Sequence, residues 1–177
     1  MATTKWVLDP THSEVQFKVK HLVISTVTGS FKTFEGTLET EGDDITNGKV
    51  EFSADVNSVD TNQGQRDGHL KSEDFFDAEK YPKLTFKSTS FTKKGDGEYT
   101  LDGDLTIKDV TKPVKLDVEY GGSAADFYGN TKAGFEVTGK INRKDFGLTW
   151  NGVTEAGSIV VGEEVKLIFN VQFAKQA

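Results

Sequence analysis

Hydrophobic and polar residues alternate along most of the chain, with the period of two that is typical of a strand with one buried face. The first clear segment places Val15, Phe17 and Val19 on one face. The same alternation recurs in five later segments, at residues 50–56, 99–107, 114–120, 133–141 and 165–173. Less regular strands are predicted at 31–40 and 84–91, where Phe31 and Phe91 interrupt the alternation and indicate β-bulges. Helical periodicity is nearly lacking, so the pattern predicts an all-β protein.

Short turn sequences separate these strands. Lys94-Gly95-Asp96-Gly97 and Gly162-Glu163 are predicted hairpin turns, and Gly42-Asp43-Asp44 with Asn47-Gly48 frames another. About eight strands with short connections predict an antiparallel meander that closes into a barrel, because closure removes exposed strand edges. The chain has 177 residues and no repeat of fixed period, so residues 1–177 are predicted to form a single domain.

Three connections are long, and long loops in a tight meander usually carry function. Residues 57–82 lack strand alternation and contain two predicted short helices, Gln65–Lys71 and Ser72–Phe76, the second with Ser72 as its N-cap. This connection is the predicted lid of the barrel. Residues 121–130 and 142–157 form the other two connections, and both are rich in Gly, Asn and Asp.

Composition and charge restrict the partners and the compartment. The 21 Lys and Arg residues against 28 Asp and Glu give a net charge of -7, which argues against nucleic acid and anionic lipid surfaces. No stretch approaches the roughly 20 apolar residues of a membrane span. Without cysteine, neither disulfides nor thiolate metal sites can form. The first residues lack the apolar stretch of a secretory signal, which predicts a cytoplasmic protein, or a periplasmic one if a signal was removed.

The interior of an eight-stranded barrel either fills with side chains or holds one small ligand. The inward stripes combine many of the 13 phenylalanines with small residues, a mixture that suits a packed core as well as an apolar cavity. The small inward residues are Ala54, Gly103, Ala133 and Gly139. A filled core is the commoner arrangement. In a cavity, each buried isoprene unit contributes about 4 kcal/mol gross, from ~0.8 kcal/mol per CH2.

Two or three such units are enough for a binding protein. Their gross contribution of about 8 to 12 kcal/mol would leave micromolar affinity or better after the ordering costs of binding. Burial of this kind requires no catalytic group.

One short segment contains the residue types of a hydrolase triad, Asp9, His12 and Ser13. Adjacent residues on an extended chain face opposite sides, so His12 cannot easily serve Ser13 as a base. The alternative is a turn at residues 9–12 that leads into a strand. The three histidines have no metal-ligand spacing such as H-E-x-x-H, and no phosphate-binding glycine loop is present. The sequence therefore predicts no catalytic residues, no metal site and no cofactor.

Two arginines and one histidine are candidate contacts for a polar head group. Arg66 and Arg143 are the only arginines, and both lie in long connections. The planar guanidinium suits a carboxylate or phosphate, so either could face the head of an amphiphile at the barrel mouth. Alternatively each pairs with a nearby aspartate, such as Asp67 or Asp145, and fixes its loop. His21 continues the inward face of the first strand and is either a ligand contact or a buried histidine bonded to backbone.

Several motifs follow one another in a fixed order along nearly the whole chain. The main ones are Trp6-x-Leu8-Asp9-x-x-His12-Ser13, Gly29-x-Phe31, Arg66-Asp67-x-His69-Leu70, Gly103-x-Leu105-Thr106-Ile107 and Asn142-Arg143-x-x-Phe146-Gly147. Together they resemble the YceI-like polyisoprenoid-binding family. The resemblance implies a lipocalin-like barrel of eight antiparallel strands, with a helical element in the long connection and an elongated apolar pocket. It also implies binding of polyprenyl phosphates, quinone-like molecules or other long-chain amphiphiles, and in some members a homodimer.

The combined prediction is a binding protein, not an enzyme, that carries or sequesters a polyisoprenoid, an isoprenoid quinone or a similar lipid inside the barrel. Eight inward residues are predicted to contact the apolar tail: Phe17, Val19, Phe52, Phe86, Leu105, Ile107, Phe135 and Phe169. Four residues are predicted to lie near the head group at the mouth: His21, Arg66, His69 and Arg143.

Two alternatives from other classes stay open. One is a stress-response or structural interaction module with a filled barrel, which would act through its outer surface or a dimer interface. The other is an enzyme acting on a lipid or quinone, which would need a polar cluster with perturbed ionisation inside the pocket.

Overall fold

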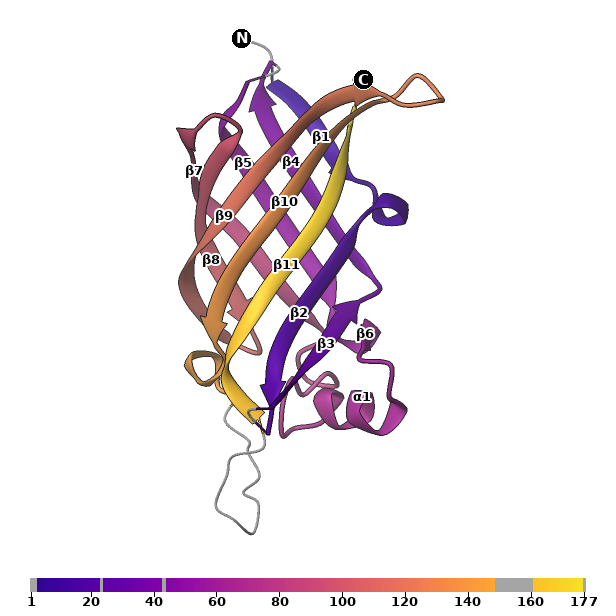
Figure 1. Ribbon diagram of the computed structural model, residues 1–177, viewed down its shortest axis with the longest axis vertical. Helices are drawn as coiled ribbons and strands as arrows, with labels where there is room; N and C mark the ends of the chain where they lie inside the picture. Colours follow the sequence, from indigo (N-terminus) through magenta and orange to yellow (C-terminus); the bar gives the residue numbers. More distant parts are fainter. Residues whose placement is uncertain (1–2, 23, 43, 149–160, 177) are drawn as a thin grey trace.

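The chain folds into a closed antiparallel β-barrel, with one α-helix beside one end (Figure 1). The computed structural model describes residues 3–22, 24–42, 44–148 and 161–176. In these residues eleven strands occupy eight positions around the barrel, because three positions are each interrupted once along the chain. The strands are β1 (Thr3–Leu8), β2 (Glu14–His21), β3 (Ser25–Phe31), β4 (Phe34–Glu41), β5 (Asp44–Asp55), β6 (Val59–Asp60), β7 (Lys83–Gly95), β8 (Glu98–Ile107), β9 (Val110–Ala125), β10 (Thr131–Asn142) and β11 (Val161–Lys175).

The interruption between β1 and β2 shows how two strands share one position. Both strands pair with β11, β1 through Leu8 opposite Phe173 and β2 through Glu14 opposite Asn170. The 3-10 helix η1 (Pro10–His12) separates them, and proline suits its first turn because proline fixes φ and needs no backbone partner there. The neighbouring position is divided in the same way between β3, which pairs with β2, and β4, which pairs with β1.

The alternation read from the sequence is confirmed by the burial of inward side chains. In β8, alternate residues from Tyr99 to Ile107 are buried. Gly103 leaves no space there, because a Cβ at Gly103 would lie 2.4 Å from Cζ of Phe86. Gly139 is covered in the same way by Leu116. Large side chains therefore face small ones in the middle of the barrel, which is the arrangement of a packed core.

Some predicted turns are correct and others are wrong. The turn after Lys94 is confirmed, with β7 ending at Gly95 and β8 beginning at Glu98. Gly162-Glu163 was a wrong turn prediction, because both residues lie inside β11, where the pairing with β2 shifts between Val161 and Val165. Asn47-Gly48 likewise lies inside β5, where Asn47 has φ 65°. Bulges use the same turn-forming residues as hairpins, which explains both errors.

The long connections are also shorter or less helical than predicted. The helix α1 (Gly64–Lys71) confirms the first predicted helix, but residues 72–76 form turns. The reason is that Phe75 N donates to Ser72 O and Phe76 N to Leu70 O, which reverses the chain. The connection predicted at 121–130 shrinks to residues 126–130, since β9 and β10 extend further than their alternation indicated. Part of the third connection, residues 149–157, lies outside the described residues.

The barrel has two different ends (Figure 1). At one end, α1 lies beside β2, β3 and the two-residue strand β6. The hairpin between β9 and β10 projects at the other end, near the last residues of β11. No helix within the described ranges has the length and apolar character that crossing a membrane requires.

Candidate ligand-binding site

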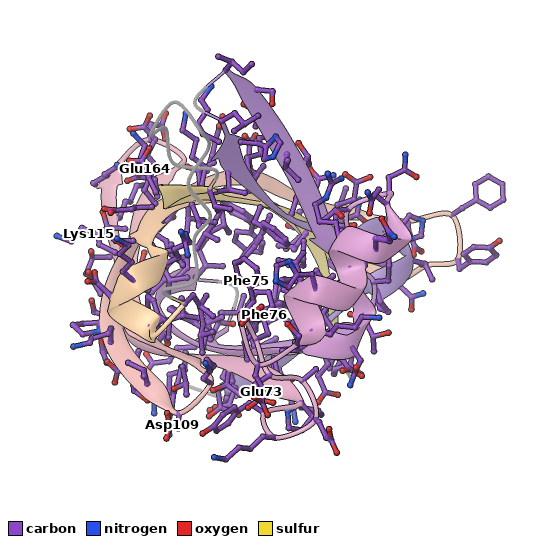
Figure 2. The ribbon with its side chains drawn as sticks, turned by 90° about the horizontal axis from the view of Figure 1, so that it is seen from below. Glu73, Phe75, Phe76, Asp109, Lys115 and Glu164 are labelled. Atoms are coloured by element: carbon purple, nitrogen blue, oxygen red, sulfur yellow. The ribbon has the colours of Figure 1, made fainter. Side chains whose placement is uncertain are left out.

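A cavity of about 390 Å³ lies inside the barrel at the α1 end. Its walls come mainly from inward side chains of β2, β3, β8 and β11, and from α1 and the turn that follows it. Figure 2 views the barrel from this end, with Phe75 and Phe76 between α1 and the interior. The volume is within the range of about 300–1,000 Å³ that is usual for small-molecule sites.

Aromatic rings connect the barrel wall to the segment after α1. The ring of Phe17 in β2 lies 5.6 Å from that of Phe31 in β3, and Phe31 lies 5.9 Å from Phe76 in an edge-on arrangement. Gly29 makes the first contact possible, because a Cβ at this position would lie 2.3 Å from Cζ of Phe17. These rings form one side of the cavity without filling it.

A second cavity of about 80 Å³ lies deeper in the barrel and is lined only by apolar residues. The two cavities share four lining residues, Leu84, Leu105, Leu167 and Phe169. They are therefore neighbours along the barrel interior, and these four side chains lie where the two cavities meet.

All eight residues predicted to contact the tail line one cavity or the other. Phe17, Val19 and Ile107 line the larger cavity; Phe52, Phe86 and Phe135 line the smaller; Leu105 and Phe169 line both. The structure thus brings residues from β2, β5, β7, β8, β10 and β11 around one interior space. That these residues contact a ligand stays a prediction.

The four residues predicted near the head group line the larger cavity. His21 is the last residue of β2, at the rim. Arg66 lies in α1 and donates from Nε to Thr61 Oγ1 at 2.8 Å and from Nη2 to Thr61 O at 2.7 Å. Asp67 accepts from Thr61 N at 2.8 Å. The alternative of an Arg66 and Asp67 pair is therefore replaced by a shared partner, Thr61, which joins α1 to the end of β6.

Arg143 is the most buried of the four, with 3% of its surface exposed. Its Nε donates to Gly162 O at 2.8 Å, and its other nitrogens donate to the carbonyl oxygens of Leu148 and Val161. Burial lowers the pKa of Arg143, and the carboxylate of Glu163 opposes that shift. Arg143 thus connects the backbone at Leu148 to the beginning of β11. These bonds give it a structural role, and a contact with a ligand stays a prediction.

His69 holds the turn after α1. Its Nε2 lies 2.8 Å from Asp74 Oδ2, and its ring packs edge-on against Phe75 with centroids 5.1 Å apart. Since Phe75 lines the cavity, His69 supports the wall as well as contributing to it.

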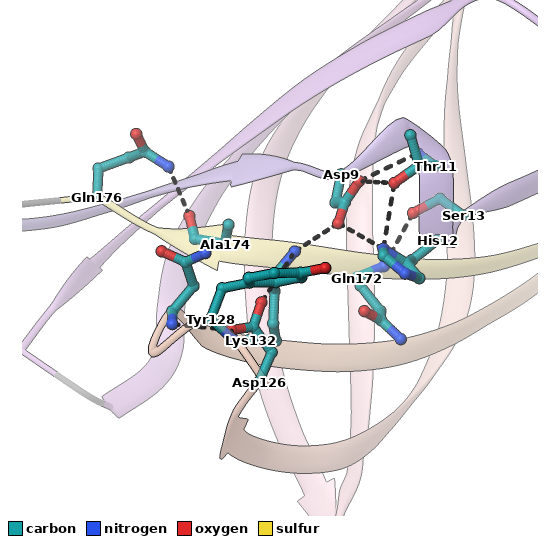
Figure 3. Close-up of polar contacts among 11 residues, drawn as sticks. Asp9, Thr11, His12, Ser13, Asp126, Tyr128, Lys132, Gln172, Ala174 and Gln176 are labelled. Atoms are coloured by element: carbon teal, nitrogen blue, oxygen red, sulfur yellow. Dashed lines mark hydrogen bonds and ion pairs between the residues drawn. The ribbon is translucent and has the colours of Figure 1, made fainter.

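Asp9, His12 and Ser13, which have the residue types of a hydrolase triad, lie at the 3-10 helix η1 between β1 and β2 (Figure 3). His12 Nδ1 lies 2.7 Å from Asp9 Oδ2, while Ser13 Oγ accepts a hydrogen bond from Gln172 N at 3.0 Å. The interpretation as a turn entering a strand is confirmed. Asp9 also accepts from Lys132 Nζ, and this bond, followed by those from His12 and Thr11, holds the pKa of Asp9 well below its usual value despite partial burial.

The family follows from comparison with known proteins. Residues 6–173 match the sequence profile described as the YceI-like domain. The chain belongs to the YceI family. Protein YceI of Salmonella newport is 41% identical over 165 residues, which cover 93% of this chain and 83% of that protein.

Two solved structures show the fold of this YceI-family protein. BcnA of Burkholderia cenocepacia has a TM-score of 0.81 at 24% identity, over 93% of this chain and 98% of BcnA. A polyisoprenoid-binding domain of Saccharophagus degradans, implicated in plant cell wall breakdown, has a TM-score of 0.68 at 18% identity, over 97% of this chain and 98% of that domain. At these identities both support the lipocalin-like architecture.

Sequence reasoning missed several residues that build the YceI-family cavity. Leu167 lies between two inward residues of β11 in the alternation, Val165 and Phe169, so the pattern could have found it. Phe75 and Phe76 ended the second predicted helix, and nothing in that prediction placed their rings at the cavity. Nothing in the sequence distinguishes Thr61, because its hydrogen bonds to Arg66 and Asp67 leave no mark on the hydrophobic pattern.

Proposed function

We propose that this protein binds one long apolar or amphiphilic molecule, such as a polyisoprenoid, an isoprenoid quinone or a similar lipid, and carries or sequesters it. The observation that supports this most is the cavity of about 390 Å³ inside a barrel whose middle is otherwise packed. An interior lined by hydrocarbon does not hold water well, so an apolar chain is the ligand that gains most from entering it.

The chemistry of the cavity wall matches an amphiphile with its head at the α1 end. Lys20, His21, Arg66 and His69 all line the larger cavity, whereas the smaller cavity has only apolar walls. Arg66 uses Nε and Nη2 on Thr61 in the described structure, which leaves Nη1 to donate to a ligand oxygen. A phosphate, hydroxyl or quinone oxygen at this rim would have donors near it, and the tail would point away from water.

The similarity to known proteins supports the same class of ligand. The Saccharophagus degradans domain with this fold is described as polyisoprenoid-binding. Two or three buried isoprene units, at about 4 kcal/mol gross each, leave enough free energy for micromolar binding after ordering costs.

Native mass spectrometry of the purified protein tests the proposal. We expect a co-purifying lipid, or a complex formed when geranylgeraniol is added in excess. Phe17→Asp places a carboxylate in the cavity wall and should abolish the complex. Phe127→Asp is the control, because Phe127 is 99% exposed and lies on the β9–β10 hairpin. Should Phe17→Asp fail to fold, Val19→Asp at the half-buried rim replaces it.

The same measurement separates the two alternatives. A change in the molecular mass of the lipid during incubation would indicate an enzyme. Wild-type protein that stays free of every lipid and prenol offered would contradict binding and favour an interaction module. We also propose a cytoplasmic location and a homodimer, which cell fractionation and light scattering of the purified protein can test.

A further inference from the structure

The interior of the barrel is divided into two compartments. The larger, of about 390 Å³, opens toward α1, and the smaller, of about 80 Å³, lies beyond it. Four side chains line both, Leu84, Leu105, Leu167 and Phe169, so the division between the compartments consists of side chains alone. Side chains can change rotamer without breaking the backbone hydrogen bonds of the barrel.

One aromatic contact lies at this division, between Phe169, which lines both compartments, and Phe52, which lines only the smaller. The ring of Phe169 stacks on that of Phe52, with centroids 5.7 Å apart and an interplanar angle of 25°. Phe169 comes from β11 and Phe52 from β5, and β1 and β4 stand between these strands in the sheet. The two rings therefore meet across the interior, not along the wall.

The four side chains that line both compartments are not equally buried. Leu84 and Leu105 are buried, whereas Leu167 and Phe169 are only half-buried although they face inward. Phe169 lines both cavities, so its ring borders empty space into which a change of rotamer could move it.

We propose that Phe169 is a gate that sets which chain lengths the barrel accepts. Short chains occupy the larger compartment only. Longer chains displace the ring of Phe169 from Phe52 and place their last carbons in the smaller compartment. This inference rests on the proposed lipid binding and adds the substrate class, which is flexible linear chains too long for the larger compartment.

The magnitudes favour opening for long chains. Each CH2 group moved from water into the smaller compartment raises affinity about fourfold, so one five-carbon isoprene unit contributes on the order of a thousandfold in gross terms. Moving a ring away from its preferred rotamer costs about 2- to 12-fold. For a chain that is one isoprene unit too long for the larger compartment, the gain in affinity from burying that unit therefore exceeds the loss from moving the ring.

The test is an affinity series over prenols of increasing length: geraniol, farnesol, geranylgeraniol and solanesol. Phe169→Ala joins the two compartments and should raise affinity for the longest prenols by about tenfold or more relative to geraniol. Phe169→Trp puts a larger side chain between the two compartments. It should lower affinity for the longest prenols by a similar factor and leave affinity for geraniol unchanged. Phe52→Ala removes the partner of the gate and should act in the same direction as Phe169→Ala.

Phe31→Ala is the matched control, because Phe31 is a buried aromatic residue that lines the larger compartment only. It should change affinity for all four prenols by a common factor. If the Phe169 variants also change all four by a common factor, the gate is wrong although lipid binding stands. If wild-type protein binds none of the four, the proposed function itself fails. Phe169→Leu serves as the milder variant should Phe169→Ala unfold.

Discussion

The two ends of the barrel differ in how completely their strands are paired. At the α1 end, β6 pairs with β3 through two residue pairs only, and residues 61–82 cover the opening without strand pairing. At the other end, called the closed end below, β1 pairs with both β4 and β11 and completes the ring of strands. The comparison shows that strand pairing is lost at the end that contains the larger cavity. There the cavity wall consists of a helix and turns, which can move more easily than paired strands.

Aromatic side chains show the same contrast. Toward the closed end, rings from four successive strands contact one another and leave little room: Tyr99, Tyr120, Phe135 and Phe173. At the α1 end, Phe17, Phe31 and Phe76 also form a series of contacts, but they border a cavity. Substitutions at the closed end should therefore cost stability, and substitutions at the α1 end should change binding.

The largest expected effect is that of Trp6→Ala at the closed end. Trp6 is 2% exposed, and its Nε1 donates to Thr40 Oγ1 at 3.1 Å. Loss of the indole should lower the free energy of unfolding by about 3–5 kcal/mol. Urea denaturation measures it. The folded fraction should still bind geranylgeraniol, and Trp6→Phe should lose much less stability. Loss of binding by the folded fraction would show that the two ends are not separable.

A smaller loss is expected from Lys132→Met beside the interrupted strand. Lys132 and Asp9 are 17% and 14% exposed, and they join the β9–β10 hairpin to the turn between β1 and β2 (Figure 3). A hydrogen bond between charged groups at such a site stabilises by about 1.5–3 kcal/mol. Thermal and urea unfolding should both detect the loss. An unchanged midpoint would mean that the cost of removing these charges from water cancels their attraction.

The same bond predicts how stability depends on pH. Because Lys132 lowers the pKa of Asp9 in the folded protein, the stabilisation is complete above the unfolded value of about 3.9 and is lost as the pH falls below it. Asp9→Asn should remove this part of the dependence, so the variant and wild type should converge in stability at low pH. Urea midpoints between neutral and strongly acidic pH measure it. A constant difference at every pH would contradict the assignment to Asp9.

The closed end was also the easier end to predict from the sequence. Alternation over β8 and β10 indicated inward residues correctly, because alternate residues are buried from Tyr99 to Ile107 in β8 and from Ala133 to Val137 in β10. The α1 end depends on contacts that do not follow strand alternation, such as the bonds of Arg66 and Asp67 to Thr61 within one connection and the ring contact between Phe31 and Phe76. Periodicity carries no information about such contacts. For the same reason, the pattern could not show that Phe86 fills the space at Gly103 while a cavity stays open nearby.

At the α1 end, Thr61→Val tests the anchor of the helix. Thr61 is buried, and its hydroxyl accepts from Arg66 and donates to Asp67. Valine keeps the shape and loses the hydrogen bonds, which should cost about 1 kcal/mol locally. Hydrogen exchange of the α1 amides should become faster, with little change in β8 to β10. Equal acceleration in all strands would show that the α1 end unfolds together with the barrel.

The smallest effect is expected from Lys94→Met, which removes an ion pair like that of Lys132. Lys94 Nζ lies 2.8 Å from Asp117 Oδ1, but the two side chains are 47% and 67% exposed. Water and salt screen such a pair, and holding two long side chains in place costs entropy, so the denaturation midpoint should not change measurably. If Lys94→Met destabilised the protein as much as Lys132→Met, partial burial would not explain the strength of the Asp9 site. Charge pairs would then stabilise this end to the same degree whether they are exposed or partly buried.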